Sequence, residues 1–367
     1  MIDCCQACLR RGFLLAHLAP RIAGLLQNRG PRTGSLLSLS DEELITAAAG
    51  RRVQRALAFL DSFDDEAERR SLSRAGTTVV CHHADAYPST LLDLGDAPAV
   101  LFGLGREDAL AVLGREPAVA LVGTRSASPY GTEVAYALGR GLGAAGVPVV
   151  SGLALGIDGT AHRGCLDGGG LPIAVLACGP DVVYPRRHRS LHERVRKTGM
   201  VLSELPPGTE PYLWSFPARN RIMAALAQLT VVVEAAQPSG SLITSEFAKD
   251  LGRSVAAVPG RVTSSIARGT NGLLRDGAVP VTGTADVLDE LFGVGMRTPV
   301  AFADRPPEPT EPLLRSVLAE VDRCPSVEAI GDATGLAVGE VRAALGRLEV
   351  DGYLVRRDLG GWERAAR

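Results

Sequence analysis

Short apolar runs alternate with longer stretches of helical spacing between residues 117 and 292. The runs are nearly continuous in apolar residues, which is typical of parallel strands that helices cover on both faces. They are Ala118–Val122, Val147–Val150, Pro172–Ala177, Met200–Leu202, Thr230–Val233, Ser254–Val258 and Val279–Thr282. Between the first two runs, Val134, Leu138 and Leu142 recur at helical spacing, and Gly146 is placed to end that helix. The pattern predicts a doubly wound α/β domain with a parallel sheet over 117–292.

The segments before this region have a different pattern. Residues 1–75 are predicted to form a small helical domain, in which Ser40–Glu43 has the sequence of a capping box at a helix start. Residues 76–116 are predicted to connect the two domains and to contain two short strands, Thr77–Cys81 and Ala99–Phe102.

The segments after it predict a linker and a third domain. Residues 293–312 contain five prolines and few apolar anchors, which favours a semi-rigid linker. Residues 313–367 show three stretches of helical spacing, followed by two short β segments around Gly360-Gly361. Three helices and a hairpin in this order predict a winged helix-turn-helix.

The composition is that of a globular protein, with 46% hydrophobic and 22% charged residues. The formal net charge is −2, so nucleic-acid binding would require a local basic patch. We find no signal-peptide pattern and no uncharged apolar run of membrane-spanning length, and we therefore expect a cytoplasmic protein without membrane contact.

The seven cysteines are odd in number and scattered, which favours reduced thiols over a disulfide framework. Cys5 and Cys8 have C-x-x-C spacing, and His17 follows further along. A zinc site requires four ligands, and no second cysteine pair follows. We therefore expect buried helix cysteines and no metal, with a zinc site as the alternative.

The first predicted strand of the α/β domain leads into the turn Gly123–Gly131. Its amides and the helix that follows favour a phosphate. Arg125 stands where the dinucleotide fingerprint has its second glycine, so the turn fits an external phosphate better than a bound dinucleotide. The alternative is a structural arginine paired with a carboxylate.

The second predicted strand leads into Ser151–His162, which opens on the same edge of the sheet. Gly152 and Gly156 permit a tight turn, and Asp158 is placed to cap the next helix. His162 lies one turn into that helix, where it would bond to its own loop or contact a ligand.

Two later segments combine basic and aromatic residues. In Tyr184–Arg189 the basic groups are either a solvated surface or a patch that follows a nucleic-acid backbone beside a stacking ring. In Trp214–Met223, Arg219 and Arg221 lie at a predicted helix start, where each cation costs about 0.3–1 kcal/mol unless an anion binds there. With Phe216, this pattern suits phosphate binding and base stacking, whereas Trp214 is as well explained by core packing.

The turn Ser239-Gly240-Ser241 opens another helix and offers further amides to an anion. No Ser/His/Asp or Cys/His set converges in the sequence, and we assign no catalytic residue. The carboxylates that suggest acid–base chemistry are Glu204, Glu234 and Glu246.

Five ordered motifs over roughly 80–292 resemble the DprA/Smf (DNA processing protein A) family. They are GTRSASPYG, SGLALGIDGTAH, FPARNRIMAAL, EAAQPSGSLITSEFA and VPGRVTSSIARGTNGLLRDGA. The N-terminal helical region, which would be SAM-like, and the C-terminal winged helix also resemble parts of longer members.

The resemblance implies a Rossmann-like domain that binds single-stranded DNA without cutting it and needs no cofactor. It also implies homodimerisation and loading of RecA recombinase onto DNA during natural transformation. Together with the amide-rich turns, it predicts DNA-binding residues Gly123, Arg125, Ser151, Gly152, Arg186, Phe216, Arg219, Asn220, Arg221, Ser239, Gly240 and Ser241. It places the dimer surface near Asn271, Leu273 and Leu274.

Two other functions remain open at this point. The sheet with its Gly-rich turns also resembles nucleotide phosphoribohydrolases of the lysine-decarboxylase-like group, but these carry Gly-Gly-x-Gly-Thr where this chain has Pro-Ser-Gly-Ser-Leu. The other alternative is a winged-helix regulator with a nucleotide sensor. Glu340 and Glu349 on the predicted third helix of the tail favour protein contact or stabilisation over duplex binding, although Arg356 and Arg357 are placed to touch phosphate.

Overall fold

The computed structural model describes residues 1–26, 34–298, 309, 311–321, 323–324, 326–351, 353–356 and 362–364. The chain forms two compact units, Met1–Val300 and Ala301–Arg367. None of the helices in the described ranges combines the length and the apolar character that a bilayer crossing requires.

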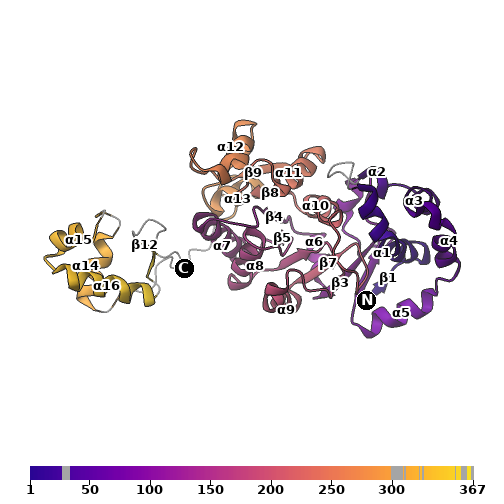
Figure 1. Ribbon diagram of the computed structural model, residues 1–367, viewed down its shortest axis with the longest axis horizontal. Helices are drawn as coiled ribbons and strands as arrows, with labels where there is room; N and C mark the ends of the chain where they lie inside the picture. The colour runs from indigo at the N-terminus through magenta and orange to yellow at the C-terminus, as the bar shows by residue number, and fades with distance from the viewer. Residues whose placement is uncertain are drawn as a thin grey trace. The chain divides into compact units, whose positions relative to one another are not determined.

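A sheet forms the centre of the first unit (Figure 1), and in the described residues it has ten strands in the order β1-β2-β3-β7-β6-β5-β4-β8-β9-β10. The strands are β1 (Ile2–Asp3), β2 (Thr78–Cys81), β3 (Val100–Gly105), β4 (Val119–Val122), β5 (Val149–Ser151), β6 (Pro172–Val175), β7 (Met200–Ser203), β8 (Leu229–Val232), β9 (Ser254–Ala257) and β10 (Val279–Pro280). From β7 to β10 every neighbouring pair is parallel, whereas β3 is antiparallel to both β2 and β7.

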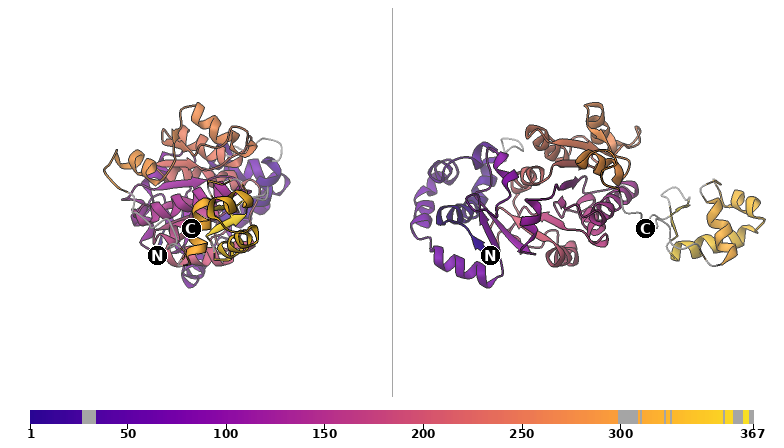
Figure 2. Two further views of the ribbon diagram at one scale, coloured as in Figure 1. Left: turned by 90° about the vertical axis from the view of Figure 1, so that its left-hand side faces the viewer. Right: turned by 180° about the vertical axis from the view of Figure 1, so that it is seen from behind.

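Helices cover both faces of this sheet (Figure 2). One face carries α7 (Pro129–Ala144), α8 (Ile157–Asp167), α9 (Arg189–Thr198) and α13 (Thr284–Phe292). The other carries α6 (Ala109–Leu113), α10 (Ser215–Leu226), α11 (Gly240–Asp250) and α12 (Arg268–Arg275). Along β4, Val119 and Leu121 pack on the first face and Ala120 and Val122 on the second, as the period of two requires.

The predicted doubly wound fold is confirmed, and each strand predicted in 117–292 is present with its ends shifted by no more than two residues. The two strands predicted before residue 117 also form, and they extend the same sheet as β2 and β3.

The N-terminal helices are α1 (Gln6–Leu26), α2 (Gly34–Leu37), α3 (Asp41–Ala49), α4 (Val53–Asp61) and α5 (Asp65–Arg74). The predicted capping box is present, since the Glu43 amide donates to Ser40 Oγ and the Ser40 amide to the Glu43 carboxylate. Helix α1 crosses β3 closely at Gly12, where an added Cβ would lie 2.6 Å from a Val100 methyl carbon. The helices therefore pack directly on the β1–β3 end of the sheet.

The second unit contains α14 (Pro312–Glu320), α15 (Val327–Thr334) and α16 (Val338–Val350), followed by an antiparallel pair, β11 (Leu354–Arg356) and β12 (Trp362–Arg364). Its core contains Val317, Ile330 and Leu345, which come from the three helices. This is the predicted winged helix. The Gly360-Gly361 turn, Arg357 and the side chain of Arg356 lie outside the described residues.

Candidate functional site

The direction of the chain reverses next to β4, which marks one edge of the sheet as the candidate site. From β4 the chain moves outward through β5 and β6 to β7, and it then returns to place β8 on the other side of β4. In open α/β sheets, ligands bind at the carboxyl ends of the strands beside such a reversal. The turns after β4, β5 and β8 are the ones that the sequence analysis selected.

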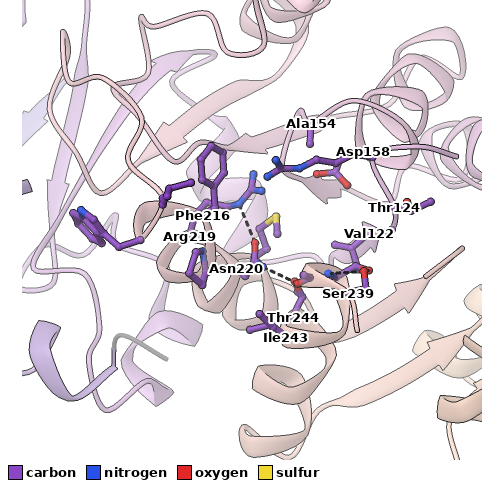
Figure 3. A pocket seen from close by; sticks show the side chains of 18 of the residues that line it. Val122, Thr124, Ala154, Asp158, Phe216, Arg219, Asn220, Ser239, Ile243 and Thr244 are labelled. Carbon is purple, nitrogen blue, oxygen red and sulfur yellow. Dashed lines mark hydrogen bonds between the residues drawn. The ribbon is translucent and has the colours of Figure 1, made fainter. Parts of the chain in front are cut away.

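A hollow of about 670 Å³ opens at this edge, and a smaller one of about 60 Å³ lies beside it. The predicted residues that line these hollows are Gly123, Arg125, Gly152, Phe216, Arg219, Asn220, Ser239, Gly240 and Ser241. Figure 3 shows Phe216, Arg219 and Asn220 together on α10, with Thr124 on the first turn, Asp158 on the second and Ser239 on the third. Of the other predicted residues, Ser151, Arg186 and Arg221 do not line these hollows.

Three side chains, from the turn after β4, the segment after β6 and the first turn of α10, form a group at the mouth of the smaller hollow. The Arg125 guanidinium carbon lies 4.8 Å from the Phe216 ring centroid, and the Tyr184 and Phe216 centroids are 5.5 Å apart. Arg125 is exposed, Phe216 is half-buried and Tyr184 is 41% exposed. No ion pair joins Arg125 to an acid of the described chain, so the structure gives no support to the alternative of a carboxylate-bound Arg125. We call these three residues the aromatic platform.

The loop that carries Arg125 is fixed by Glu234. One Glu234 carboxylate oxygen accepts the Ser128 hydroxyl at 2.7 Å, and the other accepts the Ser128 amide at 2.8 Å. Ser128 Oγ in turn accepts the Gly131 amide and caps α7. Glu234 is 4% exposed, so this carboxylate positions the loop and is not free for acid–base chemistry.

The second loop is held in a conformation that its side chains do not favour locally. Leu153 has φ 53°, which is uncommon for a residue other than glycine and costs of order 1–3 kcal/mol. Asp158 Oδ2 accepts the Gly152 amide at 3.1 Å, and His188 Nδ1 lies 3.0 Å from the Leu153 carbonyl oxygen. Burial raises the pKa of Asp158, although the nearby Arg219 opposes this rise.

Ser151 and His162 lie inside the domain. Ser151 is fully buried and donates its hydroxyl to the Leu121 carbonyl at 2.6 Å. Its side chain therefore cannot contact DNA at the surface, contrary to the prediction. His162 is also fully buried, and burial lowers its pKa to about 3. His162 therefore points from α8 into the interior of the domain.

Arg219 connects the separate parts of the rim. Its Nη1 donates to the carbonyls of Gly152 and Val175 at 2.7 and 2.6 Å, and its Nε donates to Asn220 Oδ1 at 3.2 Å. Asn220 Nδ2 donates to the Gly240 carbonyl at 3.1 Å, which ties α10 to the start of α11. Arg219 is 6% exposed, and it adds positive charge to the wall of the hollow rather than to the surface.

Arg221 was predicted to bind DNA with the rest of the FPARNRIM segment, and the structure contradicts this prediction. Its side chain has no exposure, and its guanidinium binds Asp96 Oδ2 at 2.9 Å and Glu204 Oε1 at 2.8 Å. Successive helical residues are 100° apart, so Arg221 points about 200° away from Arg219 and cannot share its hollow. The two acids hold the pKa of Arg221 above its ordinary value although burial opposes its charge. Arg221 is a core residue, and the Glu204 carboxylate is its ion-pair partner.

Trp214 also belongs to the core, as the alternative interpretation held. It is 4% exposed and packs with Leu18 and Ala218 in the cluster that joins α10 to the N-terminal helices. Its indole Nε1 donates to the Ala19 carbonyl at 3.0 Å.

The basic run after Tyr184 divides into two kinds of residue. Arg186, Arg187 and Arg189 are exposed, whereas His188 is buried and holds the second loop through Leu153. Arg186 begins the short 3-10 helix η3 (Arg186–His188), outside both hollows.

The Ser239-Gly240-Ser241 turn has the geometry of a helix cap. Ser239 Oγ accepts the Ser241 amide at 3.3 Å and lies 2.8 Å from Ser241 Oγ. Helix α11 starts at Gly240, so its positive end opens on the larger hollow.

The predicted dimer residues do not all face outward. Leu273 is 8% exposed and packs in the main core, which contradicts its place on a surface. Asn271 is half-buried and exchanges two hydrogen bonds with the Gly260 backbone, at 3.0 and 3.1 Å. Leu274 is half-buried and packs against the same core.

Two residues that matter here were not predicted as site residues. Asp96 could not be predicted, because nothing in the connecting segment marks an acid that pairs 125 residues away. Tyr184 could have been predicted, because an aromatic ring directly before a basic run is the signal for such a residue.

Together, the Rossmann-like sheet, the basic and aromatic rim and the separate winged helix define a class of α/β proteins with an attached winged-helix domain. A model of the family DNA recombination-mediator protein A matches residues 78–292, and a model of the DprA winged helix domain matches residues 301–358. The chain belongs to the DprA/Smf family.

Individual relatives agree with this assignment. The chain is 41% identical over 280 residues to a putative DNA processing protein DprA of Mycobacterium tuberculosis, covering 73% of this chain and 69% of the relative. It is 43% identical over 206 residues to DNA processing protein DprA of Streptococcus pneumoniae, covering 56% and 71%.

Two solved structures are similar over much of their length. DprA from Streptococcus pneumoniae superposes with a TM-score of 0.62 at 33% identity, over 78% of this chain and 96% of that one. DNA processing protein A from Helicobacter pylori, whose structure is described as revealing a unique single-stranded DNA binding mode, has a TM-score of 0.52 at 29% identity, over 58% and 94%.

Proposed function

We propose that this protein binds single-stranded DNA at the rim of its sheet and acts in DNA processing without catalysing a reaction. The observation that carries this proposal is the aromatic platform. It offers one exposed cation and two aromatic faces beside a hollow whose walls carry amides and Arg219.

This combination suits an unpaired strand for a physical reason. A single strand exposes base faces that stack on aromatic rings, while its phosphates need cations and amide donors. In a duplex the base faces are covered, so Phe216 and Tyr184 would have little to stack on. The single-stranded DNA binding mode described for the Helicobacter pylori relative supports the same ligand.

The absence of catalysis is part of the proposal. Of the three carboxylates suggested for acid–base work, Glu204 is bound to Arg221 and Glu234 to Ser128. Glu246 is exposed on α11 and does not line either hollow. Incubation with AMP should release no adenine, and adenine release that depends on Asp158 would favour the phosphoribohydrolase alternative.

The main experiment is a fluorescence anisotropy titration of the full chain with labelled oligo-dT and with a duplex of equal length, at several salt concentrations. We expect tighter binding of the single strand. Phe216→Ala and Arg125→Ala should both weaken it. Arg115→Ala is the matched control, because Arg115 is exposed and precedes β4, at the opposite edge of the sheet. Equal or tighter binding of the duplex would contradict the proposal.

We also propose that the chain forms a homodimer and loads RecA onto the bound strand, as the family resemblance implies. Leu274 and Asn271 on α12 are the residues of the predicted dimer surface that keep some exposure. Light scattering should give twice the chain mass for the wild type and the single mass for Leu274→Glu.

RecA loading is tested by a strand-exchange assay with protein-coated single strands. If the chain does not accelerate the assembly of RecA on these strands, the loading proposal is contradicted.

A further inference from the structure

We propose that Cys5, Cys8, Cys81 and His83 form a structural zinc site at the N-terminal end of the sheet. Their three sulfur atoms and one ring nitrogen all lie within 4.8 Å of one another. Three thiolates and one imidazole are a standard ligand set for Zn²⁺ in a closed, four-coordinate site. The site lies among β1, α1 and β2, away from the aromatic platform.

The fold brings these residues together from two parts of the chain. Strand β1 pairs with β2 in parallel, with Asp3 opposite Val80, so the residues after each strand leave the sheet side by side. Cys5 is the second residue after β1, and Cys8 lies in the first turn of α1. Cys81 ends β2, and His83 follows two residues later.

The interatomic distances match a tetrahedral metal. Zinc–sulfur bonds of about 2.3 Å and zinc–nitrogen bonds of about 2.0–2.1 Å at tetrahedral angles place a sulfur and a nitrogen ligand about 3.5 Å apart. His83 Nδ1 lies 3.5 Å from Cys5 Sγ and 3.6 Å from Cys8 Sγ. The site therefore needs only small movements to bind the ion.

The surrounding contacts also suit a metal site. The Cys5 amide donates to Cys81 Sγ at 3.4 Å, a contact that stabilises a thiolate. His83 Nε2 lies 3.0 Å from His82 Nε2, so a proton on Nε2 has an acceptor and Nδ1 is left free for the ion. Cys8 and Cys81 are buried whereas Cys5 and His83 are exposed, which gives the ion a route in from solvent.

The structure places the partners of Cys5 and Cys8 in a different segment from the one that the sequence suggested. His17, which the C-x-x-C spacing suggested as a partner, stacks on Phe59 with ring centroids 4.5 Å apart. The other two ligands come instead from the end of β2, and no second C-x-x-C pair is needed. Cys4 is also buried, but its sulfur donates to the Cys5 carbonyl and is not among the four ligand atoms that lie within 4.8 Å of one another.

The bound ion would join α1 to the sheet. Helix α1 supplies the Ala19 carbonyl that accepts the Trp214 indole, and Trp214 lies directly before α10, which carries Phe216 and Arg219. The zinc site thus fixes one end of a helix that supports the DNA-binding helix further along. We expect it to contribute to stability, with no direct contact to DNA.

The first experiment measures metal in the full chain, purified without chelator and without a metal-binding tag. Elemental analysis should find one zinc per chain, and an organomercurial that modifies thiols should release it. Cys8→Ser and Cys81→Ser should lose the metal, whereas Cys4→Ser and Cys324→Ser should keep it. Cys4→Ser is the matched control, because it changes a buried cysteine in the same segment. A chain with no zinc that also fails to take up added Zn²⁺ would overturn the proposal.

The second experiment keeps the proposal falsifiable if the buried variants do not fold. Protein produced with cobalt in place of zinc should show sulfur-to-cobalt charge transfer and the intense visible bands of tetrahedral cobalt. The exposed ligand variant His83→Asn should change these visible bands, while Cys324→Ser leaves them unchanged. Removal of the metal should lower Tm. A disulfide between Cys5 and Cys8 in protein isolated under reducing conditions, or unchanged cobalt bands in His83→Asn, would contradict the assigned ligands.

Discussion

The arginines at the rim and in the core behind it occupy two different environments. On α10, Arg219 and Arg221 are buried and their guanidinium groups bind carbonyls or carboxylates of the same chain. In the loop after β4, Arg125 is exposed, its guanidinium lies over Phe216, and no acid among the described residues forms an ion pair with it. Arg219 connects parts of the rim and Arg221 belongs to the core behind it, whereas the exposed arginine remains available to a ligand.

The difference follows from what covers α10. Residues Ala218–Leu226 are all buried, because the sheet covers one side of this helix and the N-terminal helices and connecting segment cover the other. A charged residue on such a helix must find internal partners, whereas a loop at the edge of the sheet imposes no such demand. Arginines that the sequence assigns to the same site can therefore have unrelated roles.

Replacement of Arg221 tests the buried side of this comparison most strongly. Arg221→Ala would leave Asp96 and Glu204, whose side chains are each only 11% exposed, without a counterion, and we expect it to cost about 3–5 kcal/mol of unfolding free energy. Urea denaturation measures this loss. Arg187→Ala, at an exposed position, should stay within about 0.5 kcal/mol of the wild type. Similar stabilities for the two variants would show that burial does not separate the two kinds of arginine.

The pH dependence of stability tests another buried base, His162. Its pKa is about 3 in the folded protein because of burial, whereas an unfolded histidine titrates near its ordinary value of about 6.5. Below this value the unfolded state binds a proton that the folded state does not, so stability falls by about 1.4 kcal/mol per pH unit from about pH 6.5 toward pH 3.

His162→Gln removes this contribution. Between pH 7 and pH 5 the wild type should lose about 2 kcal/mol more unfolding free energy than the variant. Parallel pH profiles for the two proteins, measured by urea denaturation, would mean that His162 is protonated in the fold.

On the exposed side, Phe216→Ala should have the largest effect on binding. Loss of a stacked base is worth about 1–3 kcal/mol of binding free energy, or roughly fivefold to 150-fold in Kd. The salt dependence of binding should hardly change, because no cation is removed. A weaker preference for oligo-dT over duplex in the same anisotropy titration would support the stacking role, and an unchanged preference would argue against it.

Arg125→Ala should have the smallest effect on affinity and the clearest effect on salt dependence. Loss of one phosphate contact lowers the slope of log K against log salt by about 0.7 for a single strand. Urea denaturation should show little change in stability, in contrast to Arg221→Ala. An unchanged slope would place Arg125 outside the contact with DNA.

The sequence predicted the sheet well because strands buried on both faces are apolar along their whole length, as Val119–Val122 and Pro172–Val175 are. It also placed Gly123, Arg125 and Ser239 at one edge, since the carboxyl ends of parallel strands share that edge. These inferences depend only on local pattern and on general rules of topology.

The partners of individual side chains could not be predicted in this way. Arg221 pairs with Asp96 from a segment 125 residues away, and Cys5 approaches Cys81 and His83 across 76 and 78 residues. Whether an arginine is buried depends on which segment covers its helix, and the sequence pattern around the arginine does not contain that information.

The sheet includes three strands from residues before 117, and this limits how the protein can be divided. Strand β3 hydrogen-bonds to β7, with Phe102 opposite Ser203, and β2 pairs with the far side of β3. A fragment that begins at residue 117 would leave unpaired the backbone groups of β7 that bond to β3, and bare strand edges are templates for intermolecular association. It would also uncover Trp214, so shortened versions for biochemical work should retain residues 1–292 as one piece.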